Sequence, residues 1–523
     1  MRATIRNSGM PVPPGVEPGS ARLAEFFEHF AEMPHRGSGT PNEPRAARLL
    51  SRWIAGHSSA LVDILPFAVD LSSGAWSIAI HGTLLCLGVG VLWAAGLGSA
   101  AVHGLGPGAA RLGWLGTLPW PYMLAALLWT LAILGSRWLM DCKGWNIVSF
   151  FVPNADSCSV VATDVPRPPM DPGYARQAEA ERWRRRFQEA KNAGVTRLRV
   201  GMAHYDSARQ LPAGKTPKFL LAALKGGLGK LPTLWLTILA LALGVPLALA
   251  AFGLTQAAYA GWQGIVLSLV LTLAAVCGLV IVAMEALMAG RSSSLPFVQG
   301  INDNLSGSAV LMETLIARCP PAGDQDNPTR RFMAIFTGSE ENGLKGAAHA
   351  ARDILVPAMD VFGPDNVELV NLDTVSGGRL CVLPREVNFS GRTVGRISGF
   401  GTDFHAWATG PVLPVSEAEA ALNPEQRALC LLNHGSGYGL VLDYADEPIP
   451  SCTDLSGVWA ALPARYRKEL RAFSIVSRSF DGDPLRRPRD YHQLSDTTET
   501  LFMEQEPGNF GTVATLALTL AKF

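Results

Sequence analysis

Residues 332–343 read Phe-Met-Ala-Ile-Phe-Thr-Gly-Ser-Glu-Glu-Asn-Gly, an apolar run followed by a turn that carries two adjacent carboxylates. The apolar run predicts a buried strand, and a helix is expected from about Gly343 to Leu355. In an α/β sheet, ligands bind in the crevice beyond the carboxyl ends of the strands. The turn after this strand is therefore a place where functional side chains can gather.

Strands and helices continue to alternate on both sides of this stretch. Val-Glu-Leu-Val-Asn-Leu (367–372) predicts another strand, Val-Thr-Arg-Leu-Arg-Val-Gly-Met (195–202) follows a charged helix at 175–193, and a closing helix is expected after Glu504. This alternation favours an α/β sandwich with a mostly parallel central sheet.

The composition is unusually apolar for a soluble protein, with 48% hydrophobic and 17% charged residues among 523. Runs without a charged residue account for this balance: 77–101, 112–136, and 231–283, which a polar stretch near 253–263 divides into two. A membrane-spanning helix needs about 20 apolar residues. We therefore expect four transmembrane helices, in two hairpins inserted into the soluble domain.

The soluble sequence is expected on one face of the membrane, because each hairpin leaves and re-enters on the same side. Near the membrane ends that face carries Arg137, Lys143, Lys230 and Arg291, whereas the hairpin loops carry only Arg111. The positive-inside rule predicts the cytoplasmic face. The expected division is a disordered lead (1–21), the soluble domain in three parts (22–76, 137–211 and 297–523), hairpin 1 (77–136), and an interfacial segment with hairpin 2 (212–296).

Several classes of function are disfavoured by the sequence. The 44 basic and 44 acidic residues give no net charge, and no basic arm stands apart, so nucleic acid has no electrostatic footprint to bind. The eight cysteines form no CxxC pair, which is compatible with a reducing compartment. No apolar run follows the N-terminal charges, so a secretory signal peptide is not expected. No charge lies mid-span to mark a transport pathway.

Metal-binding side chains concentrate in five segments, most of them at strand ends: 203–207 (Ala-His-Tyr-Asp-Ser), 302–307 (Asn-Asp-Asn-Leu-Ser-Gly), 338–343, 371–374 (Asn-Leu-Asp-Thr) and 491–497 (Tyr-His-Gln-Leu-Ser-Asp-Thr). Taken singly, each is more often structural, since Asp and Asn are common in turns. The two histidines of these segments, His204 and His492, however, each have an aspartate a few residues on, and such a carboxylate can orient a metal-bound imidazole.

In this order the segments resemble those of the co-catalytic zinc aminopeptidases, metallopeptidase family twenty-eight, which includes bacterial leucyl aminopeptidases, glutamate carboxypeptidase and glutaminyl cyclases. The resemblance covers the soluble chain from about Ala31 onward. Leu305 stands where the family has a small residue, and Asn342 precedes the Gly-Leu pair. The resemblance implies a zinc-exopeptidase fold, two Zn²⁺ ions and a peptide substrate.

The resemblance also implies a ligand set. It assigns His204 and Asp373 to one zinc ion, Glu341 and His492 to the other, and Asp303 to a bridge between the two. Imidazole and carboxylate ligands suit zinc, and a bridging carboxylate offsets the repulsion between two cations.

The catalytic roles implied by the resemblance fall to Glu340, as general base for a metal-bridged water, and to Asp206, behind the first histidine. The peptide bond between Asp303 and Asn304 is expected to be cis. Because adjacent side chains point different ways, Glu341 can bind metal while Glu340 faces the water. The expected function is a membrane-anchored zinc metallopeptidase, in the first place an aminopeptidase. The alternatives are a carboxypeptidase, a glutaminyl cyclase of the same fold, and a non-catalytic binding protein.

Some segments depart from the family pattern. Both hairpins interrupt the peptidase domain, and if both leave it on one side, the active-site strand ends lie near the bilayer. At 452–459, Asp454 matches the aspartate of a Ser-Asp-His motif of relatives, but Leu455 replaces its histidine. His405 and His434 have no counterpart and are interpreted as pocket or surface residues. The oligomeric state is not predicted.

Overall fold

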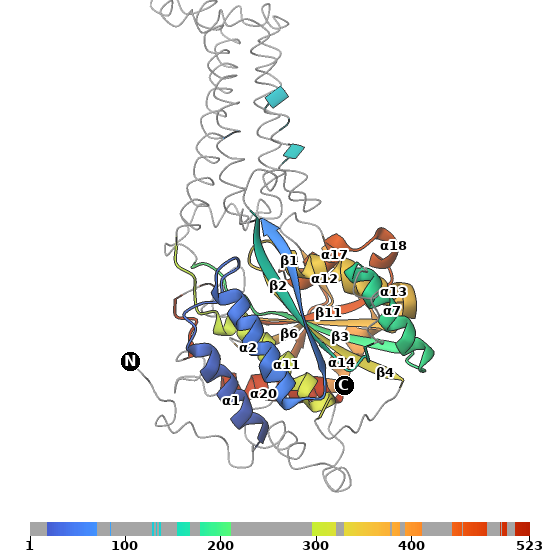
Figure 1. The fold of residues 1–523 in the computed structure, drawn as a ribbon, viewed down its shortest axis with the longest axis horizontal. Helices are drawn as coiled ribbons and strands as arrows, with labels where there is room; N and C mark the ends of the chain where they lie inside the picture. The colour runs from blue at the N-terminus through green and yellow to red at the C-terminus, as the bar shows by residue number, and fades with distance from the viewer. Residues whose placement is uncertain are drawn as a thin grey trace, which may run out of the picture.

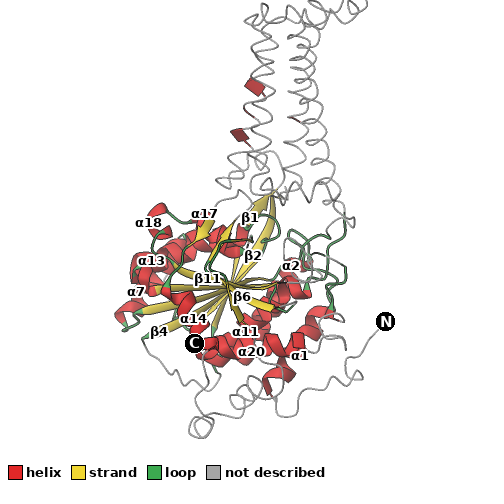
Figure 2. Cartoon of the chain, turned by 180° about the vertical axis from the view of Figure 1, so that it is seen from behind, coloured by secondary structure: helices red, strands yellow, loops and turns green. Residues whose placement is uncertain are grey.

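The computed structural model describes residues 18–70, 154–167, 178–210, 295–320, 329–376, 379–387, 393–409, 442–451, 453–478, 492, 494–498 and 508–523, and a few single positions between 84 and 136. These residues form a central sheet between two layers of helices (Figures 1 and 2). Within this described part, no helix is both long and apolar enough to cross a membrane. The four predicted spans lie outside it, apart from the single positions.

The central sheet has eight strands in the order β1-β2-β4-β3-β5-β11-β6-β9. Their bounds are β1 Leu61–Asp70, β2 Asn154–Thr163, β3 Arg197–His204, β4 Arg330–Thr337, β5 Val367–Asp373, β6 Arg379–Leu383, β9 Leu442–Tyr444 and β11 Arg471–Arg478. A smaller sheet joins β10 (Ile449–Pro450), β7 (Arg385–Val387) and β8 (Thr393–Gly395).

The large sheet is mixed. Its centre, β4-β3-β5-β11, is parallel as expected. The pairs β1/β2, β2/β4 and β11/β6 are antiparallel. The antiparallel strands β1 and β2 were not predicted, because β1 contains Pro66 and the first half of β2 is polar.

Two sets of helices cover the sheet, one on each face (Figure 2). One face packs against α1 (Pro18–Ala31), α2 (Asn42–His57), α11 (Ser306–Arg318), α14 (Gly399–Thr409) and α20 (Gly508–Lys522). The other packs against α7 (Glu179–Asn192), α12 (Lys345–Ala350), α13 (Val356–Phe362), α17 (Asp454–Ala461) and α18 (Ala464–Arg467). Short helical turns lie at Ile301–Leu305, Ala351–Leu355 and Pro364–Asn366.

The strand β3 lies in the core, since only its first residue, Arg197, is exposed; its second arginine, Arg199, is buried in an ion pair with Glu368. Val200 and Met202 pack on the α7 side, and Ala203 packs on the α11 side. Gly201 lets α11 lie close to the strand, because a Cβ there would stand 2.2 Å from Leu311 Cδ1. This close packing brings the start of α11 to the carboxyl end of β3.

Candidate metal centre

The carboxyl ends of three adjacent parallel strands carry four of the predicted site residues. β3 ends at His204 and β5 ends at Asp373, while β4 is followed by the turn with Glu340 and Glu341. His204 lies opposite Thr337, the last residue of β4. The convergence expected from the α/β pattern is therefore present in the structure.

Asp303 lies at the centre of the cluster. It comes from the turn before α11, and its peptide bond to Asn304 is cis, as expected. Its Oδ1 lies 3.3 Å from His204 Nε2, and its Oδ2 lies 3.0 Å from His492 Nε2. Each carboxylate oxygen of Asp303 thus faces a different imidazole.

Each histidine has a further carboxylate beside it. Asp373 Oδ1 is 3.6 Å from His204 Nε2, and Glu341 Oε1 is 3.2 Å from His492 Nε2. Two ligand atoms bound tetrahedrally to one zinc ion, each at about 2.0–2.1 Å, are about 3.3 Å apart. The four contacts therefore have the separations that shared zinc ions require.

Glu340 also lies within reach of metal. Potential ligand atoms gather within 4.8 Å of one another in two groups, one of His204, Glu340 and Asp373 and one of His204, Asp303 and Glu341. Glu340 Oε2 is 3.9 Å from His204 Nε2, the longest of the contacts to this nitrogen. Glu341 is the nearer of the two to an imidazole, which agrees with the expected division of the doublet.

The cluster is buried on one side and open on the other. The side chains of His204 and Asp303 are 2% and 3% exposed, whereas those of Asp373, Glu341 and His492 are 14–15% exposed. Asp303 Oδ2 and Asp373 Oδ1 are buried and accept no hydrogen bond from the described residues. Buried carboxylate oxygens without donors are costly unless a cation satisfies them.

The charges of the cluster shift one another strongly. Burial lowers the pKa of His204, but the carboxylates around it, with Glu340 first, raise that pKa well above its usual value. Although burial alone would lower the pKa of His492, Glu341 and Asp303 likewise raise it to about 10. Burial raises the pKa of Glu340 well above its usual value. Carboxylates outnumber imidazoles here, which favours bound cations.

Asp206 does more than stand behind His204. Its Oδ1 is 3.5 Å from His204 Nδ1 and accepts a hydrogen bond from the Glu340 backbone N–H (3.1 Å). Its Oδ2 accepts from the Glu341 backbone N–H (3.2 Å) and from the Ser38 hydroxyl (2.8 Å). Its side chain is fully buried. Asp206 therefore ties the end of β3 to the turn that carries the glutamate doublet.

Left-handed backbone conformations mark the same edge of the sheet. Of the four non-glycine residues with positive φ in the described chain, Ser339 (56°) precedes the doublet, Thr374 (52°) follows Asp373, and His492 (53°) belongs to the cluster itself. Such conformations persist where the surrounding structure holds them, and they gather at functional sites.

Two further residues support the cluster: Arg36, which was not predicted, and Asp496, the carboxylate expected near His492. Arg36 is fully buried and donates to the backbone carbonyls of Tyr205, Gln299 and Gly300, each at 2.6 Å. Burial lowers its pKa to about 10. Asp496 accepts from the backbone N–H groups of Asn302 (2.6 Å) and Asp303 (3.1 Å). The sequence predicted a carboxylate beside His492, and the hydrogen bonds of Asp496 to this backbone hold the turn that carries Asp303.

Asp454 lies at the back of the cluster. Its Oδ2 accepts from Thr337 Oγ1 at 2.6 Å, and burial raises its pKa to about 7. Of the unmatched histidines, His405 contacts the Leu442 carbonyl through Nε2 (3.1 Å), away from the cluster. His434 lies outside the described residues.

Residues 288–387 match peptidase family M28. This M28 segment contains Asp303, Glu340, Glu341 and Asp373, whereas His204 and His492 lie outside it. No curated protein matches the sequence.

Among solved structures, the chain is similar to an aminopeptidase from Aneurinibacillus at 12% identity, with 96% of this chain and 92% of that chain covered and a TM-score of 0.41. The zinc aminopeptidase BSAP from Bacillus subtilis matches at 11% identity, with 95% and 93% covered and a TM-score of 0.40. The LapA aminopeptidase of Legionella pneumophila matches at 10% identity, with 96% and 70% covered and a TM-score of 0.38.

Proposed function

We propose that the protein is a zinc-dependent M28 peptidase, and specifically a membrane-anchored aminopeptidase with two Zn²⁺ ions. The observation that carries the proposal is the position of Asp303, whose two oxygens face two different imidazoles at 3.3 and 3.0 Å. A carboxylate in this position suits a bridge between two cations.

The residues present fit a pair of zinc ions. His204 and Asp373 would hold one, Glu341 and His492 the other, and Asp303 both; buried oxygens of Asp303 and Asp373 that lack donors support this division. When bound, zinc supplies Lewis acidity that lowers the pKa of water and polarises a carbonyl oxygen.

Glu340 is proposed as the general base. Its carboxylate lies beside the cluster, with Oε2 3.9 Å from His204 Nε2, and Asp206 fixes its backbone. There it can take a proton from water at its carboxylate and return it to the leaving amine. Its buried surroundings raise its pKa, which favours a carboxyl group that holds the proton between the two steps.

An aminopeptidase is favoured over a carboxypeptidase because no described lysine or arginine is paired with the carboxylates on the open side of the cluster. Glu340, Glu341 and Asp373 form no ion pair with a lysine or arginine anywhere in the described residues. A basic residue would be needed there to pair with the terminal carboxylate of a peptide, because the carboxylates of the cluster are offset by the two zinc ions they would hold. Arg36 is a cation near the cluster, but it is fully buried behind it.

Membrane anchoring is proposed from the charge-free runs 77–101, 112–136 and 231–283, and the cytoplasmic location of the domain from the positive charges at their ends.

The test is hydrolysis by the purified full chain of one peptide in three forms: free at both ends, N-acetylated, and C-amidated. An aminopeptidase cleaves the free and amidated forms and spares the acetylated form. Cleavage of the acetylated form but not the amidated one would assign a carboxypeptidase, and cleavage of none of them would overturn the proposal.

A further inference from the structure

Two long segments interrupt the described domain, and the residues that flank the first of them lie side by side. Residues 71–153 connect β1 to β2, whose last ladder pair is Asp70 with Asn154. The first insert therefore starts and ends at one place, the tip of a two-stranded ribbon.

That tip stands over the same edge of the sheet as the metal centre. β2 runs antiparallel to β4, with Val160 opposite Phe336. Residues 154–158 therefore extend past Thr337, where β4 ends. At about 3.3 Å per residue, this overhang is about 17 Å long. Figure 1 shows β1 and β2 rising beyond the other strands.

The ribbon is held in this position by packing near the cluster. Tyr205, the residue after His204, donates its hydroxyl to the Cys158 carbonyl at 2.7 Å. Phe67 stacks on His349 of α12, with ring centroids 4.8 Å apart. The ribbon is thus anchored to the end of β3 and to α12, the helix that follows the glutamate doublet.

The second insert, residues 211–294, also begins and ends beside the metal centre. Gln210 N donates to the Pro296 carbonyl and Val298 N to the Ala208 carbonyl, both at 2.9 Å. Gln210 is six residues past His204, and Val298 is five residues before Asp303. Both inserts therefore leave the domain at the carboxyl edge of the sheet.

The inserts carry all the charge-free runs. In the first, Leu128 and Trp129 are 57% and 46% exposed, and Trp129 Nε1 donates to the Leu84 carbonyl at 3.0 Å, a contact between one described position of each run. Only seven residue steps separate Asp70 from Ser77, the start of the first run. A chain of that length spans at most about 25 Å.

We infer that the lipid surface lies over the carboxyl edge of the sheet, so that the metal centre faces the headgroups and takes the free ends of peptides that are themselves tethered to the membrane. This inference rests on the proposed peptidase function.

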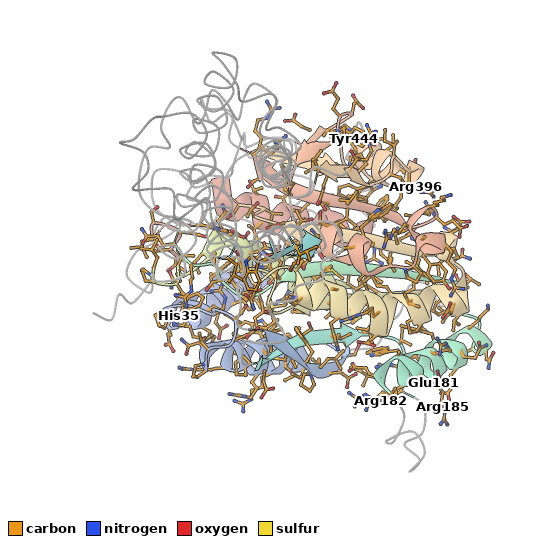
Figure 3. The ribbon with its side chains drawn as sticks, turned by 90° about the horizontal axis from the view of Figure 1, so that it is seen from above. His35, Glu181, Arg182, Arg185, Arg396 and Tyr444 are labelled. Carbon is orange, nitrogen blue, oxygen red and sulfur yellow. The ribbon has the colours of Figure 1, made fainter. Side chains whose placement is uncertain are left out.

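Figure 3, seen from above, shows the charged side chains Glu181, Arg182 and Arg185 of α7 at the periphery, on the side of the domain away from His35. His35 stacks on Phe297, where the second insert re-enters, with ring centroids 4.9 Å apart.

The first test uses the full chain in liposomes and one ten-residue peptide with a free N-terminus, either soluble or attached at its C-terminus to a phospholipid through a spacer of four or forty residues. With the four-residue spacer the peptide reaches at most about 48 Å from the lipid. We expect this form to be cleaved at least tenfold faster than the soluble peptide at equal bulk concentration.

Cleavage of the soluble and long-spacer forms without the short-spacer form would overturn the inference, because the active site would then lie beyond the reach of the short tether. Equal cleavage of the soluble and short-spacer forms would overturn it as well. Cleavage of no form would instead refute the proposed function.

A second test does not depend on activity. A fluorophore is attached at Ala68→Cys, an exposed position on the ribbon, or at Asn192→Cys, an exposed position at the opposite edge of the sheet, in a background without accessible native cysteines. A quencher carried on lipid headgroups should quench the label at position 68 and leave that at position 192 unchanged. Quenching at position 192 that equals or exceeds that at position 68 would contradict the proposed orientation.

Discussion

Replacing Arg36 with methionine tests whether the buried guanidinium positions the metal centre. Its three hydrogen bonds, each at 2.6 Å, tie the segment after His204 to the segment before Asp303. Three hydrogen bonds from a charged donor contribute about 5–9 kcal/mol in total, and the cost of burying the cation offsets several kcal/mol of this gain. We therefore expect Arg36→Met to lower the free energy of unfolding by about 3–5 kcal/mol and zinc affinity about 10- to 100-fold.

The assay combines urea unfolding of the detergent-solubilised chain with zinc titration against a competing chelator. Arg36→Lys is the matched control: it keeps the charge, but one ammonium group does not reproduce the planar fork that reaches three carbonyls. The expected order of stability and zinc affinity is wild type, then the lysine variant, then the methionine variant. If Arg36→Met unfolds at the wild-type urea concentration and binds zinc with unchanged affinity, the positioning role is refuted.

Three further predictions address other parts of the domain. Asp206→Asn should lower kcat about tenfold or more with little change in KM, because one acceptor of the two backbone N–H groups of the glutamate doublet becomes a donor; unchanged kcat would contradict this. Burial raises the pKa of Asp164 to about 6, so the stability that its protonated form contributes is fully present below the unfolded pKa of about 4 and is lost as pH rises through 6. Asp164→Asn should therefore reduce the pH dependence of the free energy of unfolding between pH 4 and 7, by up to about 3 kcal/mol at pH 7. An unchanged pH dependence would count against this prediction. A Cβ at Gly346 would stand 2.2 Å from the Gly338 carbonyl oxygen, whereas one at Gly56 meets nothing within 4 Å; Gly346→Ala should cost about 1–3 kcal/mol or more and Gly56→Ala should be neutral or stabilising, and equal unfolding midpoints would refute the packing argument.

The parallel centre of the fold could be predicted from the sequence because its signals are local, whereas the candidate ligand set followed from the order of five short segments and their resemblance to a family; the structure brings these residues together. β4 contains the apolar run 332–336 and β5 is mostly apolar; Glu340 and Glu341 follow β4 within a few positions, and Asp373 ends β5. The antiparallel ribbon was missed because Pro66 and the polar residues 154–159 oppose a strand prediction; it forms because the two segments pair with each other.

Residues that act through distant backbone could not be predicted. Arg36 contacts carbonyls 169 to 264 positions away, and its local sequence indicates only a turn. Similarly, Glu386 of β7 is buried and accepts from the hydroxyls of Thr453 (2.6 Å), Ser456 (3.0 Å) and Ser474 (2.6 Å), which only the folded sheet brings together. Such contacts depend on tertiary packing and leave no periodic pattern in the sequence.

Glu340 is proposed as a base beside two zinc ions that five other residues hold. The most direct measurement is zinc content, determined on the purified full chain and on Glu340→Gln together with their rates of peptide hydrolysis. We predict two zinc ions per chain in both proteins, with hydrolysis lost only in the variant. A wild-type chain that binds no zinc, or a variant that cleaves at the wild-type rate, would contradict the account.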